Sequence, residues 1–155
     1  MTEAQWNKTL SSIVFVNFEY NEIATIRTTG VTVESSATYK FTEDNAWISM
    51  TAAGQTQSQY APSEAAAIQA RNQIADSIRD IADYSKYVYD RTTKTYKSTV
   101  PVEIASLDAS TDDITLTFAA GKLVKIEYTI EFEKEGSTYT ADEIITIAYG
   151  GVVLP

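Results

Sequence analysis

Residues 62–84, PSEAAAIQARNQIADSIRDIADY, form the stretch of the chain with a clear helical period. Apolar residues recur there at helical spacing, which places them on one side of a helix and leaves most charged and amide side chains on the other. The apolar set is Ala67, Ile68, Ile74, Ala75, Ile78, Ile81 and Ala82. Ser63 is suited to be the N-cap, and Glu64 puts negative charge where the helix dipole favours it. The sequence therefore predicts one long amphipathic helix over 63–84.

A second, shorter helix is predicted at the N-terminus. Thr2 and Gln5 match the spacing of a capping box, and Trp6 and Leu10 supply an apolar edge to residues 2–11. We expect Trp6 to plug one end of the core, because a large ring on the apolar edge of a short helix is a common core residue.

Alternation of apolar and polar residues predicts a meander of three antiparallel strands over 13–52. The strands are Ile13–Thr28, Val31–Phe41 and Ala46–Ala52. On the first strand one side carries Val14, Val16, Phe18, Tyr20, Ala24 and Ile26. This segment is either one long strand or two strands with a kink near Asn21.

Residues 54–61, GQTQSQYA, are polar and have no period, so they are predicted to be a loop that leads into the long helix. Further strands are predicted over 86–149, beginning with a hairpin over 86–98 that carries aromatic cross-strand pairs. The strands after the hairpin are Val100–Ala105, Ile114–Phe118, Leu123–Glu133 and Ser137–Tyr149. Residues 107–113, LDASTDD, hold three aspartates but lack the spacing of a calcium-binding loop, and a turn is expected there.

Strands joined by short turns pair antiparallel, and such a sheet commonly has one packed face and one wet face. The packed face needs a cover, which the helix over 63–84 is long enough to provide. We therefore predict an α+β fold, in which a curved antiparallel sheet of about seven or eight strands packs on one long helix. The 155 residues are expected to form a single domain, 1–155.

The composition argues against several classes of function. The chain has no cysteine and no histidine, which removes the commonest metal ligands and the commonest general base. The net charge of -9 opposes binding to nucleic acid and to anionic membrane surfaces. No apolar run is long enough to cross a bilayer, so we expect no transmembrane segment. No sequence motif indicates a cofactor.

Three stretches together resemble small lipoprotein-like domains of Gram-positive bacteria. They are TEAQWNKTLSS at the start, YVYDRTTKTYKS followed by DITLTFAAGKLVKIEYTIEF, and ITIAYGGVVLP at the end. These domains have a sheet-and-helix plan similar to the lipoprotein-carrier (LolA-like) group. The resemblance implies an extracytoplasmic domain of unassigned function, tethered to a membrane through a segment that this chain lacks. A cytoplasmic protein that begins naturally at Met1 is the alternative.

The first functional hypothesis is a non-catalytic domain that binds an apolar ligand or a peptide between the helix and the concave sheet. It rests on the aromatic residues that alternation places on the inner side of the sheet, together with the resemblance. The predicted ligand-binding residues are Phe18, Tyr20, Tyr39, Phe41, Tyr128 and Phe132. The same rings would also serve as ordinary core.

The second hypothesis is a structural or protein–protein interaction module without a small ligand. Its contacts would come from an exposed strand edge or from Tyr84, Tyr87, Tyr89 and Tyr96. An enzyme built on paired carboxylates is a third hypothesis, with Glu127 and Glu131, or Asp76, Asp80 and Asp83, as its candidates. Because these carboxylates are predicted to lie on wet faces, we expect them to be solubilising charge and the protein not to be an enzyme.

Overall fold

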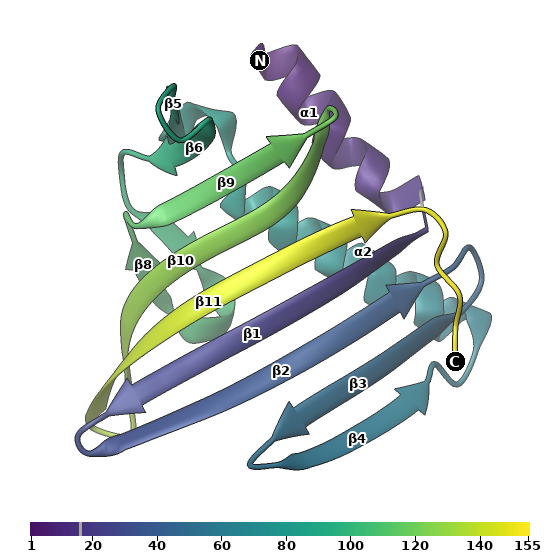
Figure 1. Ribbon diagram of the computed structural model, residues 1–155, viewed down its shortest axis with the longest axis horizontal. Coiled ribbons are helices and arrows are strands. Elements are labelled where there is room, and N and C mark those ends of the chain that lie inside the picture. The colour runs from purple at the N-terminus through teal and green to yellow at the C-terminus, as the bar shows by residue number, and fades with distance from the viewer. Residues whose placement is uncertain (16) are drawn as a thin grey trace.

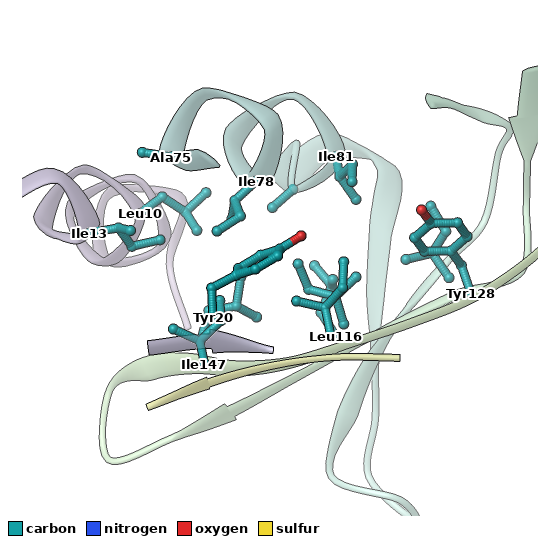
Figure 2. Close-up of a cluster of buried hydrophobic side chains, with 14 of the residues drawn as sticks. Leu10, Ile13, Tyr20, Ala75, Ile78, Ile81, Leu116, Tyr128 and Ile147 are labelled. Carbon is teal, nitrogen blue, oxygen red and sulfur yellow. The ribbon is translucent and has the colours of Figure 1, made fainter. Parts of the chain in front are cut away.

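A computed structural model describes residues 1–15 and 17–155 of the chain. The fold is α+β: a nine-stranded antiparallel sheet forms one curved layer, and a separate two-stranded sheet lies beside it (Figure 1). The helices α1 and α2 both cover the same face of the large sheet (Figure 2). We call this face the inner face and the opposite, uncovered face the outer face.

The helices are α1 (Glu3–Ser11) and α2 (Glu64–Ile81), with short 3-10 turns η1 (Ser12–Phe15), η2 (Tyr84–Lys86) and η3 (Ala105–Leu107). The first strands are β1 (Phe18–Thr28), β2 (Val31–Phe41), β3 (Ala46–Ala52) and β4 (Gln55–Tyr60). After α2 come β5 (Tyr87–Asp90), β6 (Thr95–Ser98), β7 (Val102–Ile104), β8 (Ala109–Thr111), β9 (Ile114–Ala119), β10 (Lys122–Lys134) and β11 (Ser137–Tyr149).

The strand order in the large sheet is β4-β3-β2-β1-β11-β10-β9-β6-β5, and β7 pairs only with β8. β1 therefore lies near the centre, paired on one side with the next strand in sequence and on the other with the last strand of the chain. Residues that face each other across these ladders point to the same face. The inner face of β1 thus carries Phe18, Tyr20, Glu22, Ala24 and Ile26.

The prediction of a long amphipathic helix is confirmed, with α2 ending at Ile81 instead of Tyr84. The Ser63 hydroxyl caps it by accepting a hydrogen bond of 3.1 Å from the Ala66 amide. Ala67, Ala75 and Ile78 are buried against the sheet and α1. The small alanines allow α2 to approach its neighbours closely.

The predicted N-terminal helix is confirmed, and Thr2 and Gln5 form both bonds of the capping box. The Trp6 side chain is completely buried, as expected of a core plug. Its indole nitrogen donates a 2.8 Å hydrogen bond to the carbonyl of Ala82, at the end of α2. The Trp6 ring also meets Tyr84 and Tyr96 edge-on, with centroid distances of 5.4 and 5.1 Å. Trp6 thus fastens α1 to the end of α2 and to the sheet.

The core lies between the helices and the inner face. Figure 2 shows Leu10 and Ile13 on one side, Ile78 and Ile81 of α2 above, and Ile147 and Leu116 rising from the sheet below. Burial of a large aliphatic side chain contributes about 1.5–3 kcal/mol. This set of buried residues is therefore the main source of stability.

The prediction of a strand that begins at Ile13 is wrong. Ser12–Phe15 form a 3-10 turn and β1 begins at Phe18, while Val16 lies outside the described residues. Ile13 follows Trp6 and Leu10 at helical spacing, and all three side chains are buried, so the helical period extends through Ile13. β1 then runs through Asn21 as one uninterrupted strand.

The prediction of a loop over 54–61 is also wrong, because β4 occupies Gln55–Tyr60 and pairs along its whole length with β3. The two strands are joined through Ala53 and Gly54, which both have positive φ angles of 52° and 76°. Two successive residues of this kind make the type I′ turn that suits the twist of a hairpin. The β4 side chains are polar and all exposed, so backbone pairing defines the strand without an apolar period.

The sheet is larger than predicted, with nine strands in place of seven or eight. The predicted strand Val100–Ala105 shortens to β7, and part of the predicted turn over 107–113 is its partner β8. The pairing register of β10 with β9 also shifts between Leu123 and Lys125, and Leu123 is fully buried while the adjacent Val124 is half-buried. An extra residue in one strand of an antiparallel pair causes such a shift.

Candidate functional site

A groove runs between α2 and the β3–β4 end of the inner face. Its volume is about 610 Å³. It is lined by Tyr39 of β2, Ile48 and Met50 of β3, Gln57, Ser58 and Gln59 of β4, and Ala70, Gln73 and Ile74 of α2. We call it the α2–β4 groove. Its two walls are an amphipathic helix and an edge strand, so it is open along one side of the molecule.

The floor of the α2–β4 groove is apolar. Ile48 and Met50 are two residues apart on β3 and so point to the same face, and Met50 is 50% exposed. Ala70 and Ile74 are four residues apart on α2, which places them on one face of the helix above. No other element of the described part of the chain covers the apolar surface that these residues form between β3 and α2.

Arg71 helps to fix the position of α2 over the groove. One nitrogen of its guanidinium group donates hydrogen bonds of 3.3 and 3.2 Å to the carbonyls of Thr42 and Glu43. These carbonyls belong to the turn between β2 and β3. Because Arg71 follows Ala70 directly, this contact holds the groove wall against the sheet.

The rim of the groove consists of amide side chains. Gln57 and Gln59 rise from β4, and Gln73 extends from α2. Of the described residues that line the groove, none carries a charge, although the chain has a net charge of -9. The site therefore offers apolar contact and neutral hydrogen bonding rather than an ionic attraction.

The six ligand-binding residues predicted from the sequence lie in three different places. Tyr39 lines the α2–β4 groove and meets Tyr20 edge-on at 5.7 Å. Phe18 and Phe41 are completely buried and pack together in the core, with a centroid distance of 4.9 Å. Tyr20 and Tyr128 are nearly buried between the sheet and the elements above it (Figure 2).

Phe132, the sixth residue, lines a separate groove of about 560 Å³ beside η3. Its ring stacks on Tyr139 of β11, with a centroid distance of 5.5 Å. Ile26 and Leu107 contribute further apolar surface to this second groove, and the charged residues Lys134 and Glu135 also line it. The predicted residues thus share the inner face but do not converge on one ligand.

Between the two grooves the inner face carries a pair of carboxyl groups, Glu22 of β1 and Glu143 of β11. Glu143 stands opposite Ala24, two residues beyond Glu22, so the two carboxyls are diagonal neighbours on adjacent strands. The Glu143 side chain is buried, and its Oε2 atom has no hydrogen-bond donor among the described residues. None of the four ion pairs formed by the described residues involves either carboxyl group.

Burial raises the pKa of Glu143 to about 8, and the adjacent Glu22 contributes to the rise. Glu143 therefore holds a proton at neutral pH. The pKa values of Tyr20 and Tyr128 are also raised, chiefly by burial and further by the nearby glutamates. At this point the inner face therefore carries a protonated carboxyl group that can donate a hydrogen bond.

This carboxyl pair was not predicted from the sequence, although the strand period contained the signal. Glu22 shares the phase of Tyr20 and Ala24, and Glu143 shares that of Ala141 and Ile145. A charged residue in the apolar phase of a strand marks either a buried partner or a site. The acidic candidates proposed from the sequence, such as Glu127 and Glu131, lie instead on the outer face.

The polar rim of the groove was missed for a different reason. Residues 55–60 were predicted to lie in a loop, so Gln57 and Gln59 had no assigned face. Only the pairing of β4 with β3 places their side chains beside Met50 and Ile48. This pairing depends on backbone hydrogen bonds, which leave no pattern in a polar sequence.

No protein family, curated protein or solved structure matches this chain. The site is therefore interpreted from its own geometry. Within residues 1–15 and 17–155, no helix is long and apolar enough to cross a membrane. The same part of the chain holds no group of three or more acidic residues close enough to bind a metal ion together.

Proposed function

We propose that this protein is a non-catalytic binding domain that holds an apolar ligand or peptide segment in the α2–β4 groove. The observation that carries the proposal is an apolar floor, built by Ile48, Met50 and Ile74, under a neutral amide rim. An exposed apolar strip costs free energy in water, at about 25 cal/mol per Å², and a ligand that covers it recovers that energy.

The neutral apolar dye Nile red tests the proposal. Met50→Glu places a charge on the groove floor and is expected to lower the affinity for Nile red by at least about tenfold. The matched control is Ile23→Glu, because Ile23 is similarly exposed, at 45% against 50% for Met50, but lies on the outer face. Equal Nile red affinity in the two variants would contradict the proposed site.

We also propose an extracytoplasmic location for this domain. The acidic, cysteine-free composition and the resemblance to small bacterial lipoprotein-like domains support it. Protease treatment of intact cells that express the natural gene tests this location. Digestion of the protein without lysis is the expected result, and protection until lysis would indicate the cytoplasmic alternative.

A second candidate function, protein–protein interaction, is favoured by one specific observation at the β5 end of the sheet. Tyr84, Tyr87, Tyr89, Tyr96 and Phe118 gather there around a groove of about 640 Å³. Tyr89 is 46% exposed and packs on Tyr96 at a centroid distance of 5.0 Å. Exposed tyrosine rings provide rigid contact area for a protein partner. Sedimentation at increasing protein concentration tests self-association here, and Tyr89→Ser is expected to abolish it.

A further inference from the structure

The free edge of β4 is unprotected. All six β4 residues are exposed, and Figure 1 shows the strand at the open end of the sheet. Natural edge strands are usually blunted by lysine, proline or a bulge, because their unpaired backbone groups attract other strands. β4 has none of these features: its sequence, QTQSQY, is uncharged, and its pairing with β3 is regular.

The hydrogen-bond pattern shows which backbone groups are free. The Ala61 amide donates a 2.9 Å hydrogen bond to the carbonyl of Ala46, one step beyond the Trp47–Tyr60 pair of the β3–β4 ladder. Because hydrogen-bonded and non-bonded pairs alternate in an antiparallel ladder, Gln59 and Gln57 also bond toward β3. The residues that alternate with them, Thr56, Ser58 and Tyr60, therefore direct their N–H and C=O groups outward, away from β3.

The free edge and the α2–β4 groove are continuous. Ser58 lines the groove, yet its side chain lies on the outer face, where its hydroxyl bonds to that of Ser49 at 2.8 Å. What Ser58 presents to the groove is therefore its backbone. A ligand in the groove can thus reach both the apolar floor and the outward N–H and C=O groups of β4.

We propose that the ligand is an extended peptide that pairs with β4 as an additional strand and directs alternate side chains into the groove. This inference rests on the proposed function and names its ligand class. Backbone hydrogen bonds to Thr56, Ser58 and Tyr60 supply general affinity, and the apolar floor selects peptides with apolar residues at every second position. The net charge of -9 disfavours acidic peptides.

A second copy of this chain fits the edge less well than such a peptide. Antiparallel pairing of two β4 strands about a two-fold axis would keep the same face of each strand toward the helices. That face of β4 carries Gln55, Gln57 and Gln59, whose amide side chains would leave Met50 and Ile48 without apolar cover. The apolar floor calls for apolar side chains, which the peptide supplies.

The test uses a capped peptide of alternating valine and lysine, and a matched peptide of the same sequence with N-methyl groups on all of its backbone amides, so that no amide can donate to β4 in either strand orientation. Ser58→Pro removes an outward N–H but no β3–β4 hydrogen bond, a position where edge strands tolerate proline. We expect Ser58→Pro to weaken binding of the unmethylated peptide by about tenfold, as loss of hydrogen bonds in a strand pair would. Ser58→Ala, which keeps the N–H but loses the bond to Ser49, is expected to bind as the wild type does.

The outcomes separate this inference from the proposed function. Weaker peptide binding by Ser58→Pro with unchanged Nile red binding supports strand addition. Equal peptide binding by wild type and Ser58→Pro, or Nile red binding without peptide binding, overturns strand addition and leaves the groove as a ligand site. Absence of both Nile red and peptide binding overturns the proposed function as well.

Two further measurements keep the test decisive. If Ser58→Pro does not fold, as judged by circular dichroism, the N-methylated peptide replaces it, since the protein is then unchanged; equal affinity for both peptides overturns the inference. If sedimentation shows a dimer that Ser58→Ala retains and Ser58→Pro loses, the occupant of the edge is a second copy and the peptide assignment is wrong.

Discussion

Glu143 lies beside Glu22 on the inner face of two neighbouring strands, and Glu143 retains a proton at neutral pH because burial raises its pKa to about 8. Unfolding returns Glu143 to its ordinary pKa of 4.5, so the folded state binds more protons than the unfolded state between about pH 4.5 and 8. Protonation of Glu143 therefore makes its full contribution to the free energy of unfolding below pH 4.5, and this contribution is lost as the pH rises to about 8. Between these pH values the free energy of unfolding falls by up to about 1.4 kcal/mol per pH unit.

Glu143→Gln is expected to flatten this slope and to raise stability at pH 8 and above. The amide is uncharged and can still donate a hydrogen bond to Glu22. Urea unfolding midpoints from pH 5 to 9 measure the effect, with the exposed Glu131→Gln as control. An equally steep loss of stability in Glu143→Gln would show that other groups cause it.

Trp6→Ala is expected to lower the free energy of unfolding by about 3–5 kcal/mol, because it removes a fully buried ring. Trp6→Phe keeps most of the ring but loses the hydrogen bond to the Ala82 carbonyl, and is expected to cost less. Thermal unfolding followed by circular dichroism measures both variants. Equal losses in the two would indicate that the hydrogen bond, and not the ring, is the main contribution.

Tyr39→Ala and Phe18→Ala distinguish a groove residue from a core residue. Phe18 is completely buried, so Phe18→Ala is expected to destabilise the protein by about 3–5 kcal/mol. Tyr39 is half-buried at the groove, and Tyr39→Ala is expected to weaken Nile red binding with a smaller loss of stability. Unaltered Nile red binding by Tyr39→Ala would remove Tyr39 from the site.

Ala53→Asn is expected to stabilise the β3–β4 hairpin by a few tenths to about 1 kcal/mol, because asparagine tolerates the left-handed backbone better than alanine. Ala53 has a φ angle of 52° and precedes Gly54, so the variant creates the Asn-Gly pair that type I′ turns favour. Ala52→Asn, at an extended strand position, is the control and is not expected to stabilise. Thermal unfolding of both variants checks the prediction.

The sequence was informative where side chains define an element and uninformative where backbone does. The apolar stripe of α2 and the alternation of β2, β10 and β11 predicted those elements to within a few residues. β4 was not predicted because an edge strand made mainly of glutamine, serine and threonine has no apolar phase. Ser12–Phe15 was misassigned because apolar neighbours fit both a strand and the continuation of a helix.

Only part of the candidate site was predicted, because the rest of it is defined by contacts between elements and not by a side-chain pattern. Alternation placed Tyr39 and Phe132 correctly on the inner face, but it could not tell which inner residues the helices cover. That distinction depends on where α2 crosses the sheet, which the Arg71 contacts with the β2–β3 turn help to fix. Contacts between residues so distant in sequence leave no local pattern.

The pairing of β1 with β11 has a consequence for how the molecule is made. β1 finds one of its two neighbours at once in β2, but the other only after the ribosome has synthesised β11. Until then, a growing chain has an open seam at the middle of its future sheet, and contacts of such long sequence separation form slowly. Nascent chains of this protein should therefore be substrates for chaperones that shield unpaired strands during translation.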